Sequence, residues 1–495
     1  MSQESISEPR SNRSSWLYWL VIAGLFLWVL YWLWWYEPEH DEVEHWHVAW
    51  LMHQGQQPFK DFFEHHSPLL WNLLRTYYVL VGENYGIILA SRALMVIVFA
   101  LTIWLIYRIA RRWVSPGAAW IAALGFPTFS LGLLLAHLFV RSDPLILLLL
   151  VVALWLACPL ADGKNWGKRD IHRLFWIFVC LGLALGFSPR AGIPVATLFL
   201  MLAIFSLKKI PLSNFLIYFV IGGMIVVIPT LIQAVIYHPE LYFYWVYYFS
   251  ATLYPSFSPL KNLVKLGLAA FPIWILVAVG IFSLLKNTEL RTQRSLWLVV
   301  AMAIANFFGL WASTRPYMQH FLMTIPFFGF LAGFGYDYFT KCSHQRLKLP
   351  AWNFAGLILL IGLITLYGKS YRLWSGSGLE SRPAWTERAR WLMTHCKDNA
   401  TFAGGVAYFQ PLFLSDAFYH WSGGRYATLT MRHLQPDFAP YTLDDLKNAS
   451  PDVIHESVAE AWGFARSPQF RSWLVENYDP TPFPAYWLKK TPKDP

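Results

Sequence analysis

The chain has 495 residues, of which 56% are hydrophobic and only 14% are charged, and its mean hydropathy is +0.39. This composition excludes an ordinary soluble domain and indicates an integral membrane protein in contact with membrane lipids. The net charge of +10 comes from 39 Lys and Arg against 29 Asp and Glu. These basic residues do not cluster on one soluble face, so we predict no nucleic-acid partner.

Apolar segments recur along the chain, starting with residues 16–36 after a polar stretch of fifteen residues. No small-residue cleavage site follows the first segment, so we interpret it as a retained anchor. A helical span requires about 20 apolar residues. Pro189 and Arg190 interrupt one region, which forms either a short pair of spans or one broken re-entrant element. The sequence predicts eleven spans, near residues 16–36, 86–107, 117–138, 143–160, 174–190, 191–207, 213–236, 265–285, 295–313, 319–338 and 352–368.

Basic residues fall in alternate loops between these spans. If residues 1–15 are cytoplasmic, every inside segment is basic, while the outside loops are acidic or sparsely charged. The positive-inside rule therefore places the N-terminus in the cytoplasm, and the loop 37–85 and the C-terminus outside. We expect the periplasmic face of a bacterial inner membrane. The inside residues are Arg10 and Arg13; Arg108, Arg111 and Arg112; Lys164, Lys168, Arg169 and Arg173; Lys208 and Lys209; Lys286, Arg291 and Arg294; Lys341, Arg346 and Lys348.

The C-terminal residues 369–495 are nearly neutral, with 14 Lys and Arg against 13 Asp and Glu. Helix-like stretches alternate there with short apolar pieces, which predicts a small α/β domain outside the membrane. Cys396 is the one cysteine expected outside, so we predict no disulfide within it. The predicted fold is thus an all-α polytopic membrane protein with a tail (1–15), a membrane domain (16–368) and this extracytoplasmic domain.

The first outside loop is acidic and rich in histidine. Residues 37–69 contain seven carboxylates and one lysine, Lys60. Ionisable groups at a bilayer face are costly and are commonly functional. Asp41 and Glu42 lie just past the end of a span, where a base could reach a lipid-borne substrate, so we predict them to be catalytic. The alternative is a solvated loop face or a charge pair at a helix N-terminus.

Three further outside corners each carry an arginine, and we predict that they bind a phosphate or the substrate. Carboxylates that take up a proton and cations that hold a phosphate fit phosphate-linked group transfer. Each residue also has a structural interpretation: a helix start at Asp143-Pro144, a headgroup contact for an arginine, or an interfacial belt. In these corners we predict Asp143 as catalytic, and Arg141, Arg190, Arg315, Tyr317 and His320 as binding residues. In the first loop we predict Lys60 and His66 as binding residues as well.

The histidines of this loop also suggest a metal site. His45 and His47 do not share a helix face, and no HxxxH or HExxH spacing occurs in the loop. We therefore predict no metal ligand and no certain cofactor, and leave open a divalent cation between a carboxylate and a phosphate. Walker, GxSxG and HExxH motifs are missing from the chain, which argues against an ATPase, a serine hydrolase and a gluzincin.

The first outside loop resembles that of the membrane-embedded GT-C glycosyltransferases. The similarity is carried by Asp41-Glu42, then Gly55, Pro58 and Phe59, then the run from Asp61 to His65, and Pro68-Leu69. Within that superfamily, the chain resembles the bacterial aminoarabinose transferases and the protein O-mannosyltransferases. Two departures are visible: His66-Ser67 precedes Pro68 where the aminoarabinose group has Lys-Pro, and eleven spans are fewer than that group has. Further similarities lie at Arg141 to Pro144, Pro189-Arg190, and Arg315 to His320.

The resemblance implies a polyprenyl-phosphate sugar donor and an inverting transfer to a lipid, glycan or protein acceptor. Asp41 would take the proton of the acceptor hydroxyl, and Arg190 with Arg141 or Arg315 would neutralise the leaving phosphate. The same arrangement fits a ligase that transfers a lipid-linked glycan. A transporter would instead need polar groups at the bilayer midplane, where the spans are nearly free of charge. A non-catalytic scaffold would tolerate Asp41→Asn.

Overall fold

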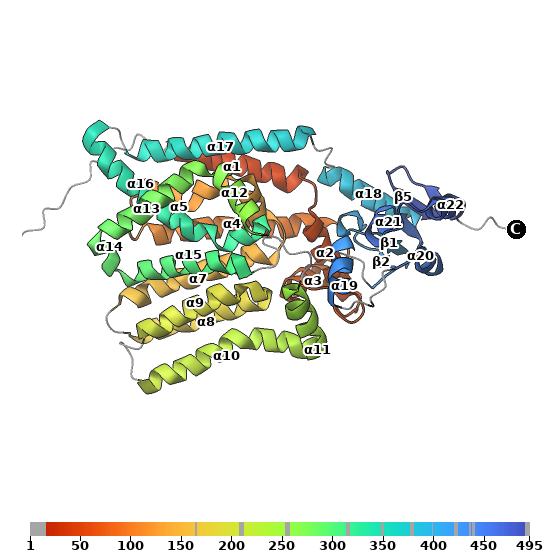
Figure 1. Ribbon diagram of the computed structural model, residues 1–495, viewed down its shortest axis with the longest axis horizontal. Helices are drawn as coiled ribbons and strands as arrows, with labels where there is room; N and C mark the ends of the chain where they lie inside the picture. The colour runs from red at the N-terminus through yellow and green to blue at the C-terminus, as the bar shows by residue number, and fades with distance from the viewer. Residues whose placement is uncertain are drawn as a thin grey trace, which may run out of the picture.

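The computed structural model describes residues 16–163, 166–206, 212–252, 258–312, 317–347, 351–376, 381–397, 399–419, 424–434, 437 and 441–490. Long helices lie side by side in a bundle, and shorter helices and a small sheet gather at one end of it (Figure 1). The predicted helical bundle with a small sheet near the C-terminus is confirmed.

The bundle helices follow the apolar runs, because a helix satisfies its own backbone hydrogen bonds where water is missing. Among the described residues, eight helices are long and apolar enough to cross a membrane, or ten if each of two bent pairs is one span. The predicted number of eleven is therefore approximate. The one predicted span that is not among these, residues 319–338, overlaps α16 (Ile325–Leu347). In α16, Asp337 and Lys341 form an ion pair of 2.9 Å. The eight helices are α1 (Trp16–Trp35), α4 (Gly86–Ala110), α7 (Ser142–Asp162), α8 (Lys168–Phe187), α9 (Gly192–Ser206), α10 (Leu212–Ile236), α15 (Arg294–Ala312) and α17 (Ala351–Gly376).

Two predicted spans are bent helix pairs. The first is α5 (Pro116–Phe129) with α6 (Leu131–Leu138), bent by 99°, and the second is α12 (Leu260–Ala269) with α13 (Phe271–Lys286), bent by 97°. At the first bend, Lys369 Nζ donates to the carbonyl oxygen of Phe129 at 3.1 Å. This contact satisfies a backbone group that the break frees from its helix.

The region interrupted by Pro189 and Arg190 forms two helices. Helix α8 ends at Phe187, a 3-10 turn (η1, Pro189–Ala191) follows, and α9 begins at Gly192. The turn is stabilised because Ser188 Oγ accepts from the backbone N–H of Arg190 at 3.3 Å. Arg190 therefore lies at a helix junction, as its position beside a proline indicated.

Helices α13 and α16 pack closely through glycines. A Cβ atom added to Gly335 would lie 1.8 Å from the carbonyl oxygen of Leu276, and one added to Gly280 would lie 1.9 Å from that of Leu331. Small residues let two membrane helices approach until their backbones touch. This contact holds α13 and α16 together in the bundle core.

The end of the bundle near the C-terminus carries α2 (His40–His53), α3 (Leu69–Val81) and the sheet (Figure 1). The sheet has the order β2-β1-β3-β5-β4, with β2, β1 and β3 parallel and the other pairs antiparallel. Phe402 pairs with Val453 in this sheet. Its strands are β1 (Thr401–Ala403), β2 (Ser415–Asp416), β3 (Val453–His455), β4 (Tyr478–Pro480) and β5 (Tyr486–Lys489).

Short elements complete this end and the helix connections. Helix α18 (Arg382–His395) leads from the bundle into the sheet region (Figure 1). The others are α11 (Pro239–Tyr242), the π-helix η2 (Phe243–Phe249), α14 (Thr288–Thr292), η3 (Met318–Met323), η4 (Ala407–Phe409), α19 (Gly424–Leu434), α20 (Leu443–Ala449), α21 (Ser457–Trp462) and α22 (Pro468–Asn477).

Candidate active site

The acidic loop begins with a capped helix. Glu39 is the N-cap of α2: its side chain accepts from the backbone N–H of Asp41 at 2.9 Å, while Glu42 accepts from the N–H of Glu39 at 3.0 Å. Carboxylates satisfy free N–H groups at a helix N-terminus and are stabilised by the helix dipole. The acidic sequence therefore starts a helix and places Asp41 in its first turn.

Glu42 forms a fully buried ion pair with Arg92 of α4. The Oε2 atom of Glu42 lies 2.7 Å from Nη2 of Arg92, and Oε1 accepts from Nε at 3.2 Å and from the backbone N–H of Val140 at 3.3 Å. With the N–H of Glu39, these donors fill both carboxylate oxygens. The prediction that Glu42 is catalytic does not fit this geometry; Glu42 instead fixes α2 against α4 and against the segment between α6 and α7.

Asp41 pairs with Arg141, as the sequence had placed both at the same membrane face. Nη2 of Arg141 lies 3.0 Å from Oδ2 of Asp41 and 2.6 Å from Oε1 of Glu39. The side chain of Asp41 is 27% exposed, whereas that of Arg141 is 8% exposed. Asp41 thus combines a fixed orientation with access from outside, which a general base requires.

The charges around Asp41 keep it ionised. Burial alone would raise its pKa, but the charge of Arg141, followed by those of His40 and His66, outweighs burial and holds the pKa below its ordinary value. The opposite holds for Glu39, whose pKa burial and the charge of Asp41 raise to about 7. At neutral pH Asp41 therefore carries a negative charge.

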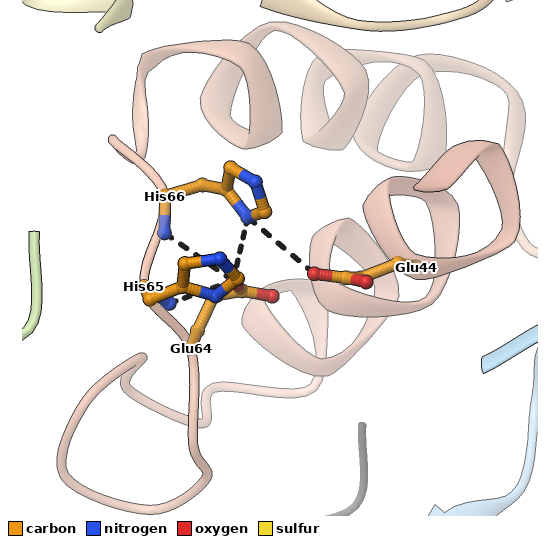
Figure 2. Close-up of side chains that lie close together, drawn as sticks. All are labelled: Glu44, Glu64, His65 and His66. Atoms are coloured by element: carbon orange, nitrogen blue, oxygen red, sulfur yellow. Dashed lines mark hydrogen bonds and ion pairs between the residues drawn. The ribbon is translucent and has the colours of Figure 1, made fainter. Parts of the chain in front are cut away.

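A second group of side chains lies beside this pair: Glu44, Glu64, His65 and His66 (Figure 2). Nδ1 of His66 is 2.8 Å from Oε1 of Glu64 and 3.4 Å from Oε1 of Glu44. The same Glu64 oxygen accepts from the backbone N–H groups of His65 and His66 at 2.7 and 3.3 Å. Both carboxylates are almost completely buried. His66 therefore bridges α2 and the returning loop.

The pKa values in this cluster shift in opposite directions. Burial and the charge of Glu64 raise the pKa of Glu44 well above its ordinary value. Burial would lower the pKa of His66, but the hydrogen bonds that it donates to Glu44 and Glu64 outweigh burial and raise the pKa to about 10. Burial would raise the pKa of Glu64, and its hydrogen bonds with His65 and His66 lower it instead. The cluster thus contains an ionised Glu64 and a protonated His66.

We expect the stability advantage of the wild type over His66→Gln to shrink as the pH rises. The fold raises the pKa of His66 from 6.5 to about 10. A group with a raised folded pKa stabilises fully below its unfolded pKa, and this contribution is lost as the pH rises through the folded value. Thermal unfolding midpoints of both proteins at about pH 6 and about pH 10 measure it. An equal difference at both pH values would contradict the assignment.

The remaining predicted residues fall into two groups. Asp143 is buried in the first turn of α7, and its Oδ1 atom has no hydrogen-bond partner among the described residues. Arg190 is half-buried; after burial and His66, its charge helps lower the pKa of His65, which places it near the cluster. These two residues therefore adjoin the centre formed by Asp41.

The other group is not brought to the centre by any described contact. Lys60 is exposed, and its backbone N–H donates to Gln57. His320 is buried and Tyr317 is exposed; their rings meet edge to face at the start of η3, which packs against α6 and α7. Arg315 lies outside the described residues.

Sequence reasoning missed several residues of the centre. Arg92 is the clearest case, because an arginine inside the apolar run 86–107 is costly and indicates a paired or functional residue. Glu39 was missed because it is one of several neighbouring carboxylates, and nothing in the sequence distinguishes it as the N-cap of α2. Glu44 and Glu64 are twenty residues apart, and only the return of the loop brings them to one histidine.

The same cluster has the composition of a metal site, although the sequence predicted none. One ligand atom from each of Glu44, Glu64, His65 and His66 lies within 4.8 Å of the others. Oε2 of Glu64 is buried without a hydrogen-bond partner among the described residues. Two carboxylates and two imidazoles fit a divalent transition metal ion.

Solved structures with the same fold are membrane glycosyltransferases. ArnT from Cupriavidus metallidurans bound to undecaprenyl phosphate has 13% sequence identity and a TM-score of 0.60, covering 91% of this chain and 95% of that one. AglB from Archaeoglobus fulgidus in complex with an inhibitory peptide and a dolichol-phosphate has 13% identity and a TM-score of 0.53, covering 97% and 75%. The predicted GT-C fold is therefore confirmed. The sequence matches no protein-family model and no curated protein.

Proposed function

We propose that this protein is a glycosyltransferase that moves a sugar from a polyprenyl-phosphate donor to an acceptor hydroxyl at one membrane face. The observation that carries the proposal is the pair of Asp41 and Arg141 at the end of the bundle, with Arg190 and Asp143 adjoining it. ArnT and AglB, which share the fold, were solved with undecaprenyl phosphate and a dolichol-phosphate. A lipid-phosphate leaving group also agrees with the missing nucleotide motifs.

The reaction balances as one in-line displacement. The acceptor oxygen forms a bond to the anomeric carbon as the bond from that carbon to the phosphate oxygen breaks. The electron pair leaves with the phosphate, and the hydroxyl proton goes to the carboxylate of Asp41. A single displacement inverts the anomeric centre. Arg141 orients Asp41 through their 3.0 Å contact.

Arg190 is the cation that we assign to the leaving phosphate. Within the described residues no ion pair occupies its side chain, and its charge acts on both His65 and Asp143. Arginine binds phosphate through parallel N–H donors and stays charged at all relevant pH values. The arrangement favours an enzyme over a transporter, because the charged groups gather at one end of the bundle and not at its middle.

Binding of undecaprenyl phosphate to purified protein tests the proposal. We expect Arg190→Gln to weaken binding about 10- to 150-fold, since a charge-assisted hydrogen bond contributes about 1.5–3 kcal/mol. Arg112→Gln is the matched control, because Arg112 forms an exposed pair with Asp162 away from the centre. Native mass spectrometry in detergent gives both affinities. No binding by the wild type, or equal affinities for the two variants, would contradict the assignment.

We also propose that Glu44, Glu64, His65 and His66 hold a divalent cation. The ion would displace the proton of His66 and supply the positive charge between the two buried carboxylates in its place. Elemental analysis of the purified protein should find about one zinc or manganese ion per chain, and Glu64→Gln should lose it. Asp61→Asn, an exposed carboxylate of the same loop, should retain it. Equal metal content in the two variants would exclude this site.

The orientation also belongs to the proposal. The alternating charges of the loops place the N-terminus in the cytoplasm, and the loop 37–85 and the sheet in the periplasm. The active site would then open toward the periplasm, where a flipped lipid-linked sugar is available. Single cysteines introduced as Lys60→Cys and Ser2→Cys test this orientation with a membrane-impermeant reagent. Applied from the periplasmic side, the reagent should label position 60 and not position 2.

A further inference from the structure

The helix that carries Asp41 is fastened to the C-terminal sheet by a buried histidine. His47 is fully buried on α2. Its Nδ1 atom lies 2.7 Å from the carbonyl oxygen of Leu412, and its Nε2 atom lies 2.9 Å from Oδ2 of Asp416, the last residue of β2. The two partners of this contact are 369 residues apart in the chain. Both ring nitrogens of His47 are thus committed to the sheet region.

Asp416 is itself held in place by Gln410. The Nε2 atom of Gln410 donates to Oδ1 of Asp416 at 2.9 Å and to the carbonyl oxygen of Leu414 at 2.8 Å, and it lies 3.0 Å from Nε2 of His47. Gln410 is 1% exposed. A buried network with several fixed partners sets the direction of each member, which an apolar contact of equal size would not do.

A second attachment from the same segment reaches the loop before the cluster. The backbone N–H of Phe63 donates to the carbonyl oxygen of Tyr419 at 2.7 Å, and the hydroxyl of Tyr419 donates to the carbonyl oxygen of Phe59 at 2.6 Å. Phe63 immediately precedes Glu64. The position of the carboxylate and the two histidines that follow is therefore set partly from the C-terminal region.

Aromatic packing reinforces both attachments. The ring of Phe413 contacts those of Trp50 on α2, Tyr78 on α3 and Tyr85, with centroid distances of 6.1, 6.1 and 5.0 Å. Aromatic pairs at such separations stabilise a contact beyond the effect of the area that they bury. Residues 410–419 thus contact α2, α3 and the loop at the same time.

We propose that residues 410–419 are the positioning element of the active site, with His47 and Asp416 as its central pair. This inference rests on the proposed function. Asp41 must be aligned with the donor to within a fraction of an ångström, and a shift of about 1 Å can lower the rate about 100-fold. The contact between His47 and Asp416 sets the orientation of α2, and the backbone contact of Tyr419 sets the position of the loop. Residues 410–419 therefore act on the site through α2 and the loop.

Two variants of the full-length protein test the inference: Asp416→Asn and, as a matched control, Asp452→Asn. Asp452 lies in the same region and accepts from the backbone N–H of Thr401 at 2.9 Å, but it does not contact α2. We expect Asp416→Asn to lower kcat about 10- to 100-fold while KM for the donor stays near the wild-type value. Asp452→Asn should leave kcat within about twofold of the wild type. The double variant His47→Gln with Asp416→Asn should lose no more than the worse single variant.

Hydrogen–deuterium exchange gives a readout that does not depend on the reaction. In Asp416→Asn the amides of residues 59–66 and of α2 should exchange faster than in the wild type, while exchange in β1, β3 and β5 stays unchanged. Unchanged exchange at residues 59–66 would overturn the inference, as would equal kcat values for the two single variants. If the wild type transfers no sugar but the exchange result holds, the proposed function fails and the positioning contact stands.

Discussion

Replacing Asp41 with Asn should lower sugar transfer about 100- to 10,000-fold, the range that a positioned general base contributes. The change keeps the size of the side chain and one acceptor oxygen toward Arg141, but it removes the negative charge that takes up the hydroxyl proton. Because the charges of Arg141, His40 and His66 lower the pKa of Asp41, no protonated fraction limits the wild type near neutral pH. Transfer of labelled sugar from the polyprenyl-phosphate donor to acceptor in membranes measures the loss.

Asp61→Asn is the control for this experiment. Asp61 lies in the same loop and is exposed, and it accepts from the backbone N–H of Gln57 at 2.7 Å. Its replacement should leave transfer within about twofold of the wild type, as for most surface substitutions. Equal transfer by Asp41→Asn and Asp61→Asn, at equal protein levels, would remove the base from Asp41. Asp143, with its unpartnered buried oxygen, would be the next candidate.

Replacing Arg92 with Met should have the largest effect on stability. Arg92 is fully buried and holds Glu42 at 2.7 Å, and it also donates to the carbonyl oxygens of Tyr36 and Glu37 at 2.9 Å. Removing one partner of a buried pair costs about 3–5 kcal/mol, because the other charge is left without compensation. The free energy of unfolding in mixed detergent micelles measures the loss.

Two further variants make the result for Arg92 interpretable. Arg112→Met breaks the exposed pair with Asp162 and should cost less than about 1 kcal/mol. Adding Glu42→Leu to Arg92→Met removes both charges, so the double variant should be more stable than Arg92→Met alone. A double variant that is less stable than both single variants would show that the pair itself is not the source of the effect.

The sequence predicted the helical bundle because long apolar runs dominate its composition. It did not reveal the bends at Ser130 and Ala270, since an apolar run has the same composition whether the helix in it is straight or broken. The sequence also predicts a span at residues 319–338, in the same way as for the other apolar runs. Asp337 and Lys341 of α16 show that this helix is less apolar than its neighbours.

At the site, the sequence placed Asp41, Arg141, Asp143 and Arg190 at one membrane face, and the structure brings Asp41 and Arg141 to 3.0 Å. The pairing could be anticipated because each residue lies next to a span end. The role of Glu42 could not, since its partner Arg92 lies fifty residues away.

The contact of His47 with Asp416 was beyond sequence reasoning for the same reason. No local pattern connects a helix after the first span to a strand near the C-terminus. The sequence pattern does not predict a partner for His47, because a buried histidine on an apolar helix face is usually interpreted as a core residue. Only the packing of residues 410–419 over α2 gives it a partner.

The most direct test of the central claim is transfer from synthetic polyprenyl-phosphate sugars that carry a label in the sugar. Membranes with the wild-type protein should move label from at least one such donor to an acceptor, and membranes with Asp41→Asn should not. Label moving equally well from a nucleotide sugar when all polyprenyl phosphate is removed would contradict a lipid-linked donor. Failure of the wild type with every donor in a broad panel of polyprenyl-phosphate hexoses and pentoses would contradict a glycosyltransferase.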